Sequence, residues 1–400
     1  MNMFEANKKL LELTKGIEPW VVDLRRRLHQ CPELLYELHQ TSALVCETLD
    51  SLGVIYEQGI AETGVLATIG HDDSSCIMLR ADMDALPIVE AADVSFRSQN
   101  EGRMHACGHD CHIAMLLGAA KLLKEREQDL PMTVKLCFQP AEEGGAGGKR
   151  MCDEGVMTSP SVSKVFGLHV WPMIPTGQLT GRPGAFLAAT NNFEIRVRGK
   201  GGHAALPHLC VDPVVTAAKI ITSLQSIISR EQNALEPAVV SVTAITAGSS
   251  YNVIPEEVTI KGTIRSMCSE NRDQLKVRLA EAASGIALAD RCQADFVSVG
   301  EDYPVTFNDP DLWDAVHRFG EGLVGEGNFE LCDPLLGGED FAYYGQYAPT
   351  CFVALGCGNE EEGCTYGLHH PQFKVDENAL HLGTALHLAF VSEHARSIGR

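Results

Sequence analysis

Short apolar runs that alternate with helical patterns constrain the fold of this chain more than any other feature. The runs are each short enough for one strand and occupy residues 76–79, 134–138, 165–168 and 351–355. Apolar residues recur at helical spacing over residues 4–52 and 113–123. Alternation of this kind is typical of an α/β domain with a largely parallel sheet.

The middle of the chain has a different order of elements. It predicts strands at residues 193–197, 239–245, 258–264 and 294–299, and helices at residues 212–228 and 271–288. The order β-α-β-β-α-β is that of a small ferredoxin-like domain. Because the first pattern resumes after Pro304 and 400 residues are too many for one core, we predict two domains. A metal-binding α/β catalytic domain would comprise residues 1–184 and 304–400, and an inserted ferredoxin-like α+β domain residues 185–303.

Charge and cysteine use exclude several classes of partner. The formal net charge of -21 disfavours nucleic acid and anionic lipid as partners. From its first residues we expect neither a signal peptide nor a membrane anchor, and we predict no segment that spans a bilayer, because none is long and apolar enough. The 14 cysteines are scattered through a long chain, which indicates free thiols in a reducing cytoplasm rather than a disulfide scaffold.

Polar side chains gather where the predicted strands end. The clusters that follow strands are Asp82 with Asp84, Glu142 with Glu143, and His169. Cys107 and His109 precede a predicted helix, and a late loop carries His369 and His370. Since ligands of open α/β sheets bind beyond the carboxyl ends of strands, we expect these residues to form one site.

The residue types in these clusters suit a divalent transition metal. Imidazole, carboxylate and thiolate ligands together favour zinc, manganese, cobalt or nickel. Pairs of such ions are a known device for hydrolysis, and one of the adjacent Glu142 and Glu143 could bind metal while the other transfers a proton. Asp82 and Asp84 could be ligands or could orient the ligand histidines, and we favour the orienting role. Each residue alone has an ordinary structural explanation, but together they favour a metal site.

Many segments also resemble one enzyme family in order along the chain. They are 27–29 (RLH) with Pro32 and Glu33, 79–87 (LRADMDALP), 105–110 (HACGHD), 139–143 (QPAEE), 167–169 (GLH), 199–203 (GKGGH), 252–255 (NVIP), 262–265 (GTIR), 338–341 (GEDF) and 369–371 (HHP). The sequence resembles the M20 metallopeptidase clan. Within it, the resemblance is to hippurate hydrolases, N-acyl-amino-acid amidohydrolases and plant auxin-conjugate hydrolases.

This resemblance implies a set of roles for individual residues. It implies two divalent metal ions held by Cys107, His109, Glu143, His169 and His369, with Cys107 as the bridge. It implies Glu142 as general base and acid, and an inserted domain that acts as a lid and as the interface of a homodimer. It further implies that His203 stabilises the oxyanion in the neighbouring subunit, and that Asn252 and Arg265 hold the substrate carboxylate. We also expect Glu339 and Asp340 to support the site.

The predicted reaction is metal-dependent hydrolysis of the amide bond of an N-acyl amino acid or a peptide-like amide. A dipeptidase or aminopeptidase of the same clan is the first alternative, although no group that would bind a free amine is apparent. A metal-binding module without catalysis is the second, and the retention of Glu142 beside Glu143 argues against it. The sequence leaves open the acyl group, the amino acid, the native metal, any higher oligomer and the pathway.

Overall fold

The chain forms two compact units in the computed structural model, which describes residues 7–70 and 75–398. Unit 1 comprises Met1–Phe186, Phe307–Asp333 and Asp340–Arg400, and unit 2 comprises Leu187–Thr306 and Pro334–Glu339. The predicted division into a catalytic domain and an inserted domain, with limits at 184/185 and 303/304, stays a prediction. The two units are defined by compactness alone, which does not show what either one does. Of the helix predicted from residue 4, residues 4–6 lie outside the described part of the chain.

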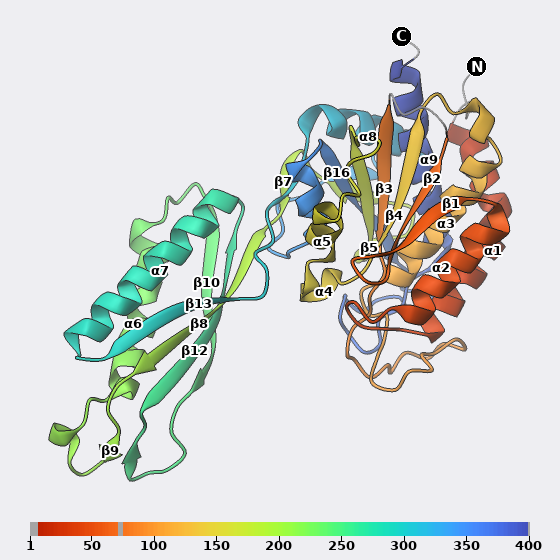
Figure 1. Ribbon diagram of the computed structural model, residues 1–400. Helices are drawn as coiled ribbons and strands as arrows, with labels where there is room; N and C mark the ends of the chain where they lie inside the picture. Colours follow the sequence, from red (N-terminus) through yellow and green to blue (C-terminus); the bar gives the residue numbers. More distant parts are fainter. Residues whose placement is uncertain (1–6, 71–74, 399–400) are drawn as a thin grey trace. The chain divides into compact units, whose positions relative to one another are not determined.

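Unit 1 is built around an 8-stranded sheet with the order β1-β2-β4-β3-β5-β16-β6-β15 (Figure 1). The strands are β1 (Ile55–Ile60), β2 (Gly64–Ile69), β3 (Cys76–Asp82), β4 (Thr133–Gln139), β5 (Val165–Pro175), β6 (Leu179–Gly181), β15 (Phe329–Leu331) and β16 (Thr350–Gly358). The central strands β4, β3, β5 and β16 are all parallel neighbours, while β1, β2 and β4 pair antiparallel. This mostly parallel sheet confirms the predicted α/β class. The hairpin β1–β2 was not predicted, because its first strand is largely exposed and carries no apolar run.

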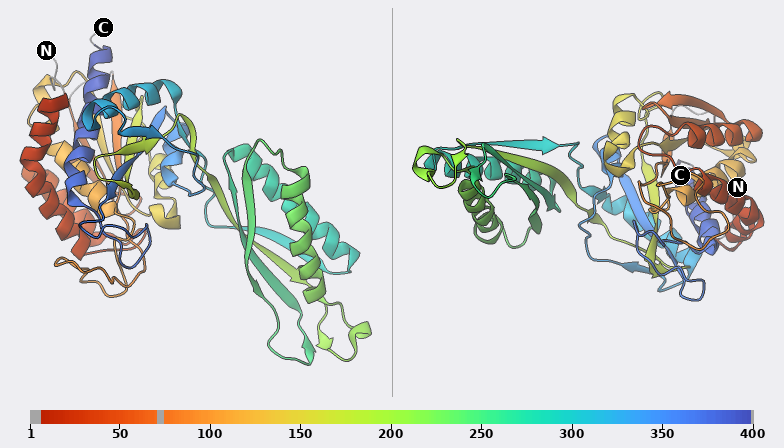
Figure 2. Two further views of the ribbon diagram at one scale, coloured as in Figure 1. Left: turned by 180° about the vertical axis from the view of Figure 1, so that it is seen from behind. Right: turned by 90° about the horizontal axis from the view of Figure 1, so that it is seen from below.

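Helices cover one face of this sheet and a shorter segment lies on the other. The helices are α1 (Asn7–Gln30), α2 (His39–Leu52), α3 (His109–Lys124), α8 (Pro310–Val324) and α9 (Leu380–Ile398). Figure 2 shows α1 (red) beside α9 (dark blue) from two further sides, and both helices also contact α3. On β5, Phe166 stacks on Phe390 of α9 at 5.0 Å, whereas the next residue, Gly167, faces the ring of Phe341. Because successive strand residues point to opposite faces, the 3-10 segment Asp340–Gln346 lies on the face away from α9.

Two elements of unit 1 differ from the prediction at the residues that matter for a site. Helix α3 begins at His109 instead of near Ile113, since Gly108 has a φ of 87° and its carbonyl accepts a hydrogen bond from the Cys111 amide at 2.9 Å. Strand β5 extends to Pro175 because β16 pairs with it along this length, so His169 lies inside the strand and not after it. As a result, His109 starts a largely buried helix and His169 is held by a central strand.

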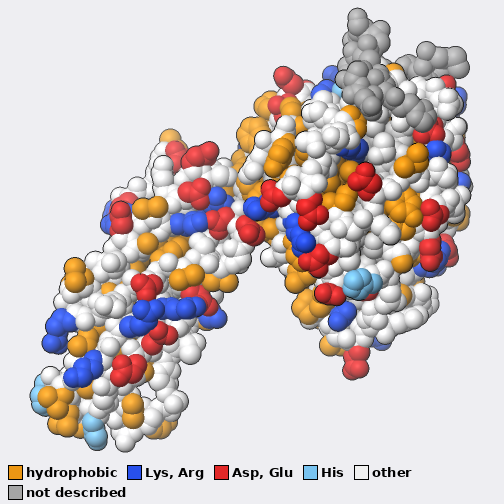
Figure 3. Space-filling model, viewed as in Figure 1, with side chains coloured by type: hydrophobic (Ala, Val, Ile, Leu, Met, Phe, Trp, Pro, Cys, Tyr) orange, Lys and Arg blue, Asp and Glu red, His pale blue; other side chains and the backbone are white. Residues whose placement is uncertain are grey.

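Unit 2 has the predicted β-α-β-β-α-β order, and its 4-stranded sheet is arranged β10-β12-β8-β13. Its elements are β8 (Ala189–Arg198), α6 (Pro213–Ser226), β10 (Ala238–Thr246), β12 (Glu257–Ser266), α7 (Ser269–Ala289) and β13 (Gln293–Val299). Apolar residues of α6 and α7 pack with Phe193, Ile195 and Val197 of β8 in one core. Basic and acidic side chains are interspersed over the face of unit 2 drawn in Figure 3. Two of the ion pairs of this unit join Glu194 to Arg196 and to Lys261.

The structure bears on the predictions about cysteines and membrane spans. All 14 cysteines are free thiols, and most of them are buried. Within residues 7–70 and 75–398, none of the helices combines the length and the apolar character that a bilayer crossing requires.

Candidate metal centre

The candidate ligands of unit 1 come together in space at the carboxyl ends of β3 and β4. Ligand atoms of Cys107, Glu143 and His369 lie within 4.8 Å of one another, and so do those of His109, Glu142 and Glu143. A further group that meets the same distance criterion has four members, Asp82, His109, His112 and His169. Because these groups share His109 and Glu143, the predicted ligands form one continuous cluster.

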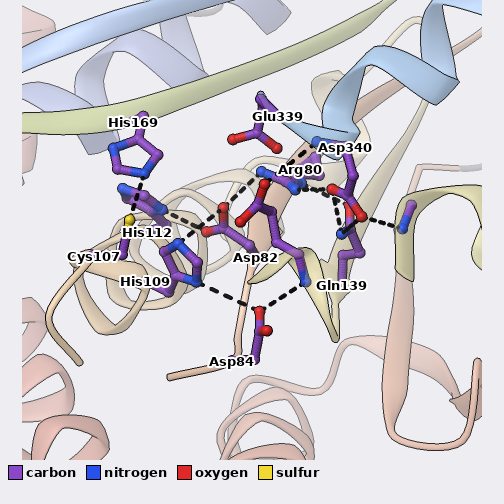
Figure 4. Close-up of polar contacts among 12 residues, drawn as sticks. Arg80, Asp82, Asp84, Cys107, His109, His112, Gln139, His169, Glu339 and Asp340 are labelled. Carbon is purple, nitrogen blue, oxygen red and sulfur yellow. Dashed lines mark hydrogen bonds and ion pairs between the residues drawn. The ribbon is translucent and has the colours of Figure 1, made fainter. Parts of the chain in front are cut away.

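Cys107 and His169 face each other in this cluster (Figure 4). The Sγ atom of Cys107 lies 3.4 Å from Nε2 of His169, and Nδ1 of His169 lies 2.7 Å from the carbonyl oxygen of Val170. Nδ1 therefore donates to that carbonyl, which leaves the Nε2 lone pair directed at the thiol. Burial lowers the pKa of His169 well below its ordinary value, so the ring is neutral, as a metal ligand must be.

His109 is the most unusual member of the cluster, because it is buried and neither ring nitrogen has a hydrogen-bond partner among the described residues. Its Nε2 lies 3.6 Å from Asp82 and its Nδ1 3.6 Å from Asp84. Burial opposes a charge on this ring, but the field of Asp82 and the nearby Asp84 raise the pKa of His109 to about 10. A bound cation would take the place of that proton.

Asp82, at the end of β3, orients a histidine that the sequence analysis did not single out. Its Oδ1 lies 2.5 Å from Nδ1 of His112, and its Oδ2 accepts a hydrogen bond from Arg80 at 2.8 Å. The Nε2 atom of His112 accepts a hydrogen bond from the Val170 amide at 2.9 Å. Both ring nitrogens of His112 are thus occupied, and we infer that it supports the cluster and does not bind metal. Its position three residues after His109 on α3 was the available sequence signal.

Asp84 positions the pair of glutamates. Its two carboxylate oxygens accept hydrogen bonds from the amides of Glu142 at 2.9 Å and of Glu143 at 3.1 Å. These amides begin the short segment α4 (Glu142–Gly145), which Ala141 enters with a positive φ of 57°. An acceptor at these amides is favourable because the first amides of a helical turn have no partner within it. The placement fits an orienting role for Asp84.

The loop that carries His369 is attached to the Cys107 loop. The His369 amide donates to the carbonyl of Ala106 at 2.8 Å, and its Nε2 lies 3.3 Å from Oε1 of Glu143 without hydrogen-bond geometry. The neighbouring His370 instead stacks on Tyr366 at 4.4 Å. Of these two histidines, His369 is therefore the one placed with the ligands.

A second buried network supports the ends of β3 and β4. Asp340 accepts hydrogen bonds from Arg80 at 2.8 Å, from the Gln139 side chain at 2.7 Å and from the Gly148 amide at 2.8 Å. Arg80 thereby joins Asp340 to Asp82 (Figure 4). Burial raises the pKa of Asp340 to about 6 in spite of Arg80. Arg80 and Gln139 were noted only as parts of motifs, because nothing in their spacing predicts a shared partner far along the chain.

The other predicted site residues lie in unit 2. His203 is on β9 (Gly202–His203), and Asn252 precedes β11 (Val253–Ile254), which pairs with β9. Both side chains are exposed, and the Asn252 carbonyl accepts a hydrogen bond from the Ala204 amide at 3.0 Å. Arg265 lies near the end of β12, where it is paired with Thr190 of β8.

The residues of the cluster fit a metal site. Both ring nitrogens of His109 and the Oε1 atom of Glu143 are buried without hydrogen bonds to the described part of the chain, which is costly unless another group satisfies them. Burial and the carboxylates of Glu143 and Glu142 raise the pKa of the Cys107 thiol well above its ordinary value, and a cation would reverse this effect. The donor set of imidazole, thiolate and carboxylate suits a divalent transition metal. A cavity of about 430 Å³ lies elsewhere in unit 1, beside Arg25, His29 and Phe96, and shares none of these ligands.

Comparison with known proteins places the chain in a family. A family model described as peptidase family M20/M25/M40 matches residues 78–393. IAA-amino acid hydrolase ILR1-like 4 of Arabidopsis thaliana is 41% identical over 391 residues, which cover 96% of this chain and 88% of that protein. N-acetyl-L-cysteine deacetylase of Bacillus subtilis (strain 168) is 38% identical over 371 residues, or 91% of this chain and 85% of that protein.

A solved structure agrees with these matches. The Bacillus subtilis YXEP protein, described as a dinuclear metal binding peptidase from the M20 family, superimposes with a TM-score of 0.82 at 33% identity. The match covers 96% of this chain and 99% of that one. The sequence resemblance and the predicted class of enzyme are thereby confirmed, and the chain belongs to peptidase family M20/M25/M40.

Proposed function

We propose that this protein hydrolyses the amide bond of N-acyl amino acids and releases a carboxylic acid and a free amino acid. The observation that carries the proposal is the continuous cluster of ligand atoms beside Glu142, whose residues are buried or partly buried apart from the exposed His369. The names of the two relatives, a hydrolase of amino acid conjugates and a deacetylase of an N-acetyl amino acid, support this substrate class.

Cys107, His109, Glu143, His169 and His369 would hold two divalent ions of manganese, zinc, cobalt or nickel. Cys107 is the candidate bridge, because its thiol lies near His169 on one side and belongs to the group of Glu143 and His369 on the other. When bound, such ions polarise a carbonyl oxygen and lower the pKa of water. The Asp82 and Asp84 carboxylates would keep the ligand side chains in place.

Glu142 would transfer the proton. It is 7% exposed and begins α4, so its carboxylate is held beside Glu143 and close to His109. A carboxylate at this place can accept a proton from the attacking water and pass it to the leaving amine. Glu143 would meanwhile remain with the metal ligands.

The geometry of unit 2 favours a homodimer in which two copies complete each site. Arg265 lies eight residues beyond Glu257 along β12, which is about 26 Å at the rise of an extended strand. His203 and Asn252 lie past the Glu257 end of this sheet, on the β9–β11 ribbon (Figure 1). An N-acyl amino acid is too short to reach both ends of one unit 2. His203 as oxyanion donor and Arg265 as carboxylate ligand would therefore come from different copies.

Unit 2 also exposes surfaces that a second copy could cover. Strand β10 is at an edge of the sheet, and its Ile245 is 56% exposed. Val214 and Val215 at the start of α6 are exposed as well. Open strand edges and apolar side chains are typical of association surfaces. We further propose the cytoplasm as the location, in keeping with the free thiols.

A substrate panel tests the proposed reaction. Metal-free protein would be loaded with manganese, zinc, cobalt or nickel and assayed for release of amino acid from N-acetyl, N-benzoyl and indoleacetyl conjugates. The matched glycyl dipeptides, which carry a free amine, serve as the comparison. Metal-dependent release from an N-acyl amino acid supports the proposal. Turnover of dipeptides alone, or no turnover with any of the four metals bound, contradicts it.

A further inference from the structure

His29 lies outside the ligand cluster but has an uncommon environment. It is near the end of α1, is 2% exposed, and is not among the predicted site residues. Its Nδ1 lies 2.8 Å from Asp110 and its Nε2 3.1 Å from Glu90, and both carboxylates are buried. A buried ring with a carboxylate on each nitrogen connects two segments that are distant in sequence.

The first connection reaches the segment that carries His109. Asp110 is the second residue of α3, directly after His109. Its Oδ2 atom is bonded both to His29 and to Nε of Arg25, the latter at 2.8 Å. Two side chains of α1 therefore hold the first turn of α3, and with it the backbone of a candidate ligand.

The second connection reaches the segment that carries His369. The other carboxylate oxygen of Glu90 accepts a hydrogen bond from the Ser98 amide at 2.6 Å, which fixes this loop. The next residue, Ala91, donates its amide to the carbonyl of Pro371 at 2.7 Å. Pro371 is two residues after His369, whose own amide is bonded to Ala106 of the Cys107 loop.

We propose that His29 is a positioning residue that fixes the His109 helix and the His369 loop relative to each other through Asp110 and Glu90. A ligand set drawn from separate segments binds metal well only if those segments are held in register before the ion arrives. His29 is the point at which the two connections meet. The inference rests on the metal ligands of the proposed function.

The test compares His29→Gln with His381→Gln. A glutamine amide carries both of its N–H donors on one nitrogen, so it cannot reproduce the two separate ring nitrogens that face Asp110 and Glu90. His381 is a matched control, because it lies 3.2 Å from the Glu18 carboxylate, outside both connections. Zinc affinity is measured by competition with a chromophoric chelator. His29→Gln should weaken it about 10- to 100-fold and alter the visible spectrum of the cobalt-loaded protein, whereas His381→Gln should match the wild type. A folded His29→Gln protein with wild-type zinc affinity and cobalt spectrum overturns the proposal, even if its metal-free form is less stable.

Glu90→Gln keeps the proposal testable if His29→Gln does not fold. This variant preserves the side-chain shape but removes the charge opposite Nε2 of His29, so zinc affinity should again fall and the cobalt spectrum should change. Unchanged zinc binding by folded Glu90→Gln overturns the proposal. These measurements use no substrate, so they are independent of the proposed reaction. If the protein binds zinc but hydrolyses none of the N-acyl amino acids, that result contradicts the proposed function and leaves the role of His29 unaffected. Normal turnover combined with unchanged binding by the variants contradicts only the role of His29.

Discussion

Replacement of His387 by leucine tests whether a buried histidine among the helices of unit 1 makes the stability of the protein depend on pH. His387 lies on α9, is 1% exposed, and packs edge-on against Phe166 at 5.6 Å. Neither of its ring nitrogens has a hydrogen-bond partner among the described residues. Burial lowers the pKa of His387 to about 3, whereas a histidine in an unfolded chain has a pKa of about 6.5.

The pH dependence follows from this difference between the two states. Below pH 6.5 the unfolded chain binds a proton at His387, but the folded protein does so only near pH 3. The contribution of this residue to stability is therefore complete above pH 6.5 and decreases as the pH falls. The loss is about 1.4 kcal/mol per pH unit, or about 2 kcal/mol between pH 6.5 and pH 5. The free energy of unfolding of His387→Leu should fall by about 2 kcal/mol less than that of the wild type over this interval.

Urea unfolding of the metal-free proteins at pH 7.5 and pH 5 measures this effect. The three tryptophans, Trp20, Trp171 and Trp313, all belong to unit 1, so their fluorescence follows the unit that contains His387. His39→Leu is the control, because the side chain of His39 is 74% exposed and is in water before and after unfolding. Equal losses of stability between the two pH values in wild type and His387→Leu would refute the reasoning.

Three further predictions concern the candidate site. Glu142→Gln should retain zinc affinity and lose about 10²- to 10⁴-fold in kcat, the usual cost of a missing general base; a near-normal kcat would exclude that role. Cys107 should be alkylated more slowly with metal bound than after chelation, although burial and the nearby carboxylates make even the metal-free thiol slow to react, and the less buried Cys268 should be labelled in both states; mass spectrometry showing equal rates of labelling of Cys107 with and without metal would contradict the ligand role. His203→Ala and Glu142→Gln, each nearly inactive alone, should recover activity when unfolded and refolded together if His203 serves the neighbouring copy. Activity at background in the mixture would place His203 in its own copy.

Much of the fold could be predicted because the signals are local. Apolar runs and helical spacing are read within a few residues, and they were enough for the central strands and for the ferredoxin-like order of unit 2. The polar clusters followed from the same reading, since Asp82 ends β3 and Glu142 comes shortly after β4. The individual ligand roles came from family motifs and stay predictions. The limits of α3 and β5 were wrong because the first depends on the backbone at Gly108 and the second on pairing with β16.

The sequence by itself determined the class of fold, the order of elements and the side-chain types available for a metal site. The tertiary structure decided what several of these side chains do. His112 is one residue before a predicted apolar helix, yet its tautomer and role follow from contacts with Asp82 of β3 and Val170 of β5. His29 became significant only when Asp110 and Glu90 were seen on its two nitrogens. Whether two side chains form a hydrogen bond depends on how segments far apart in the sequence pack together. Periodicity and local spacing in the sequence do not encode this packing.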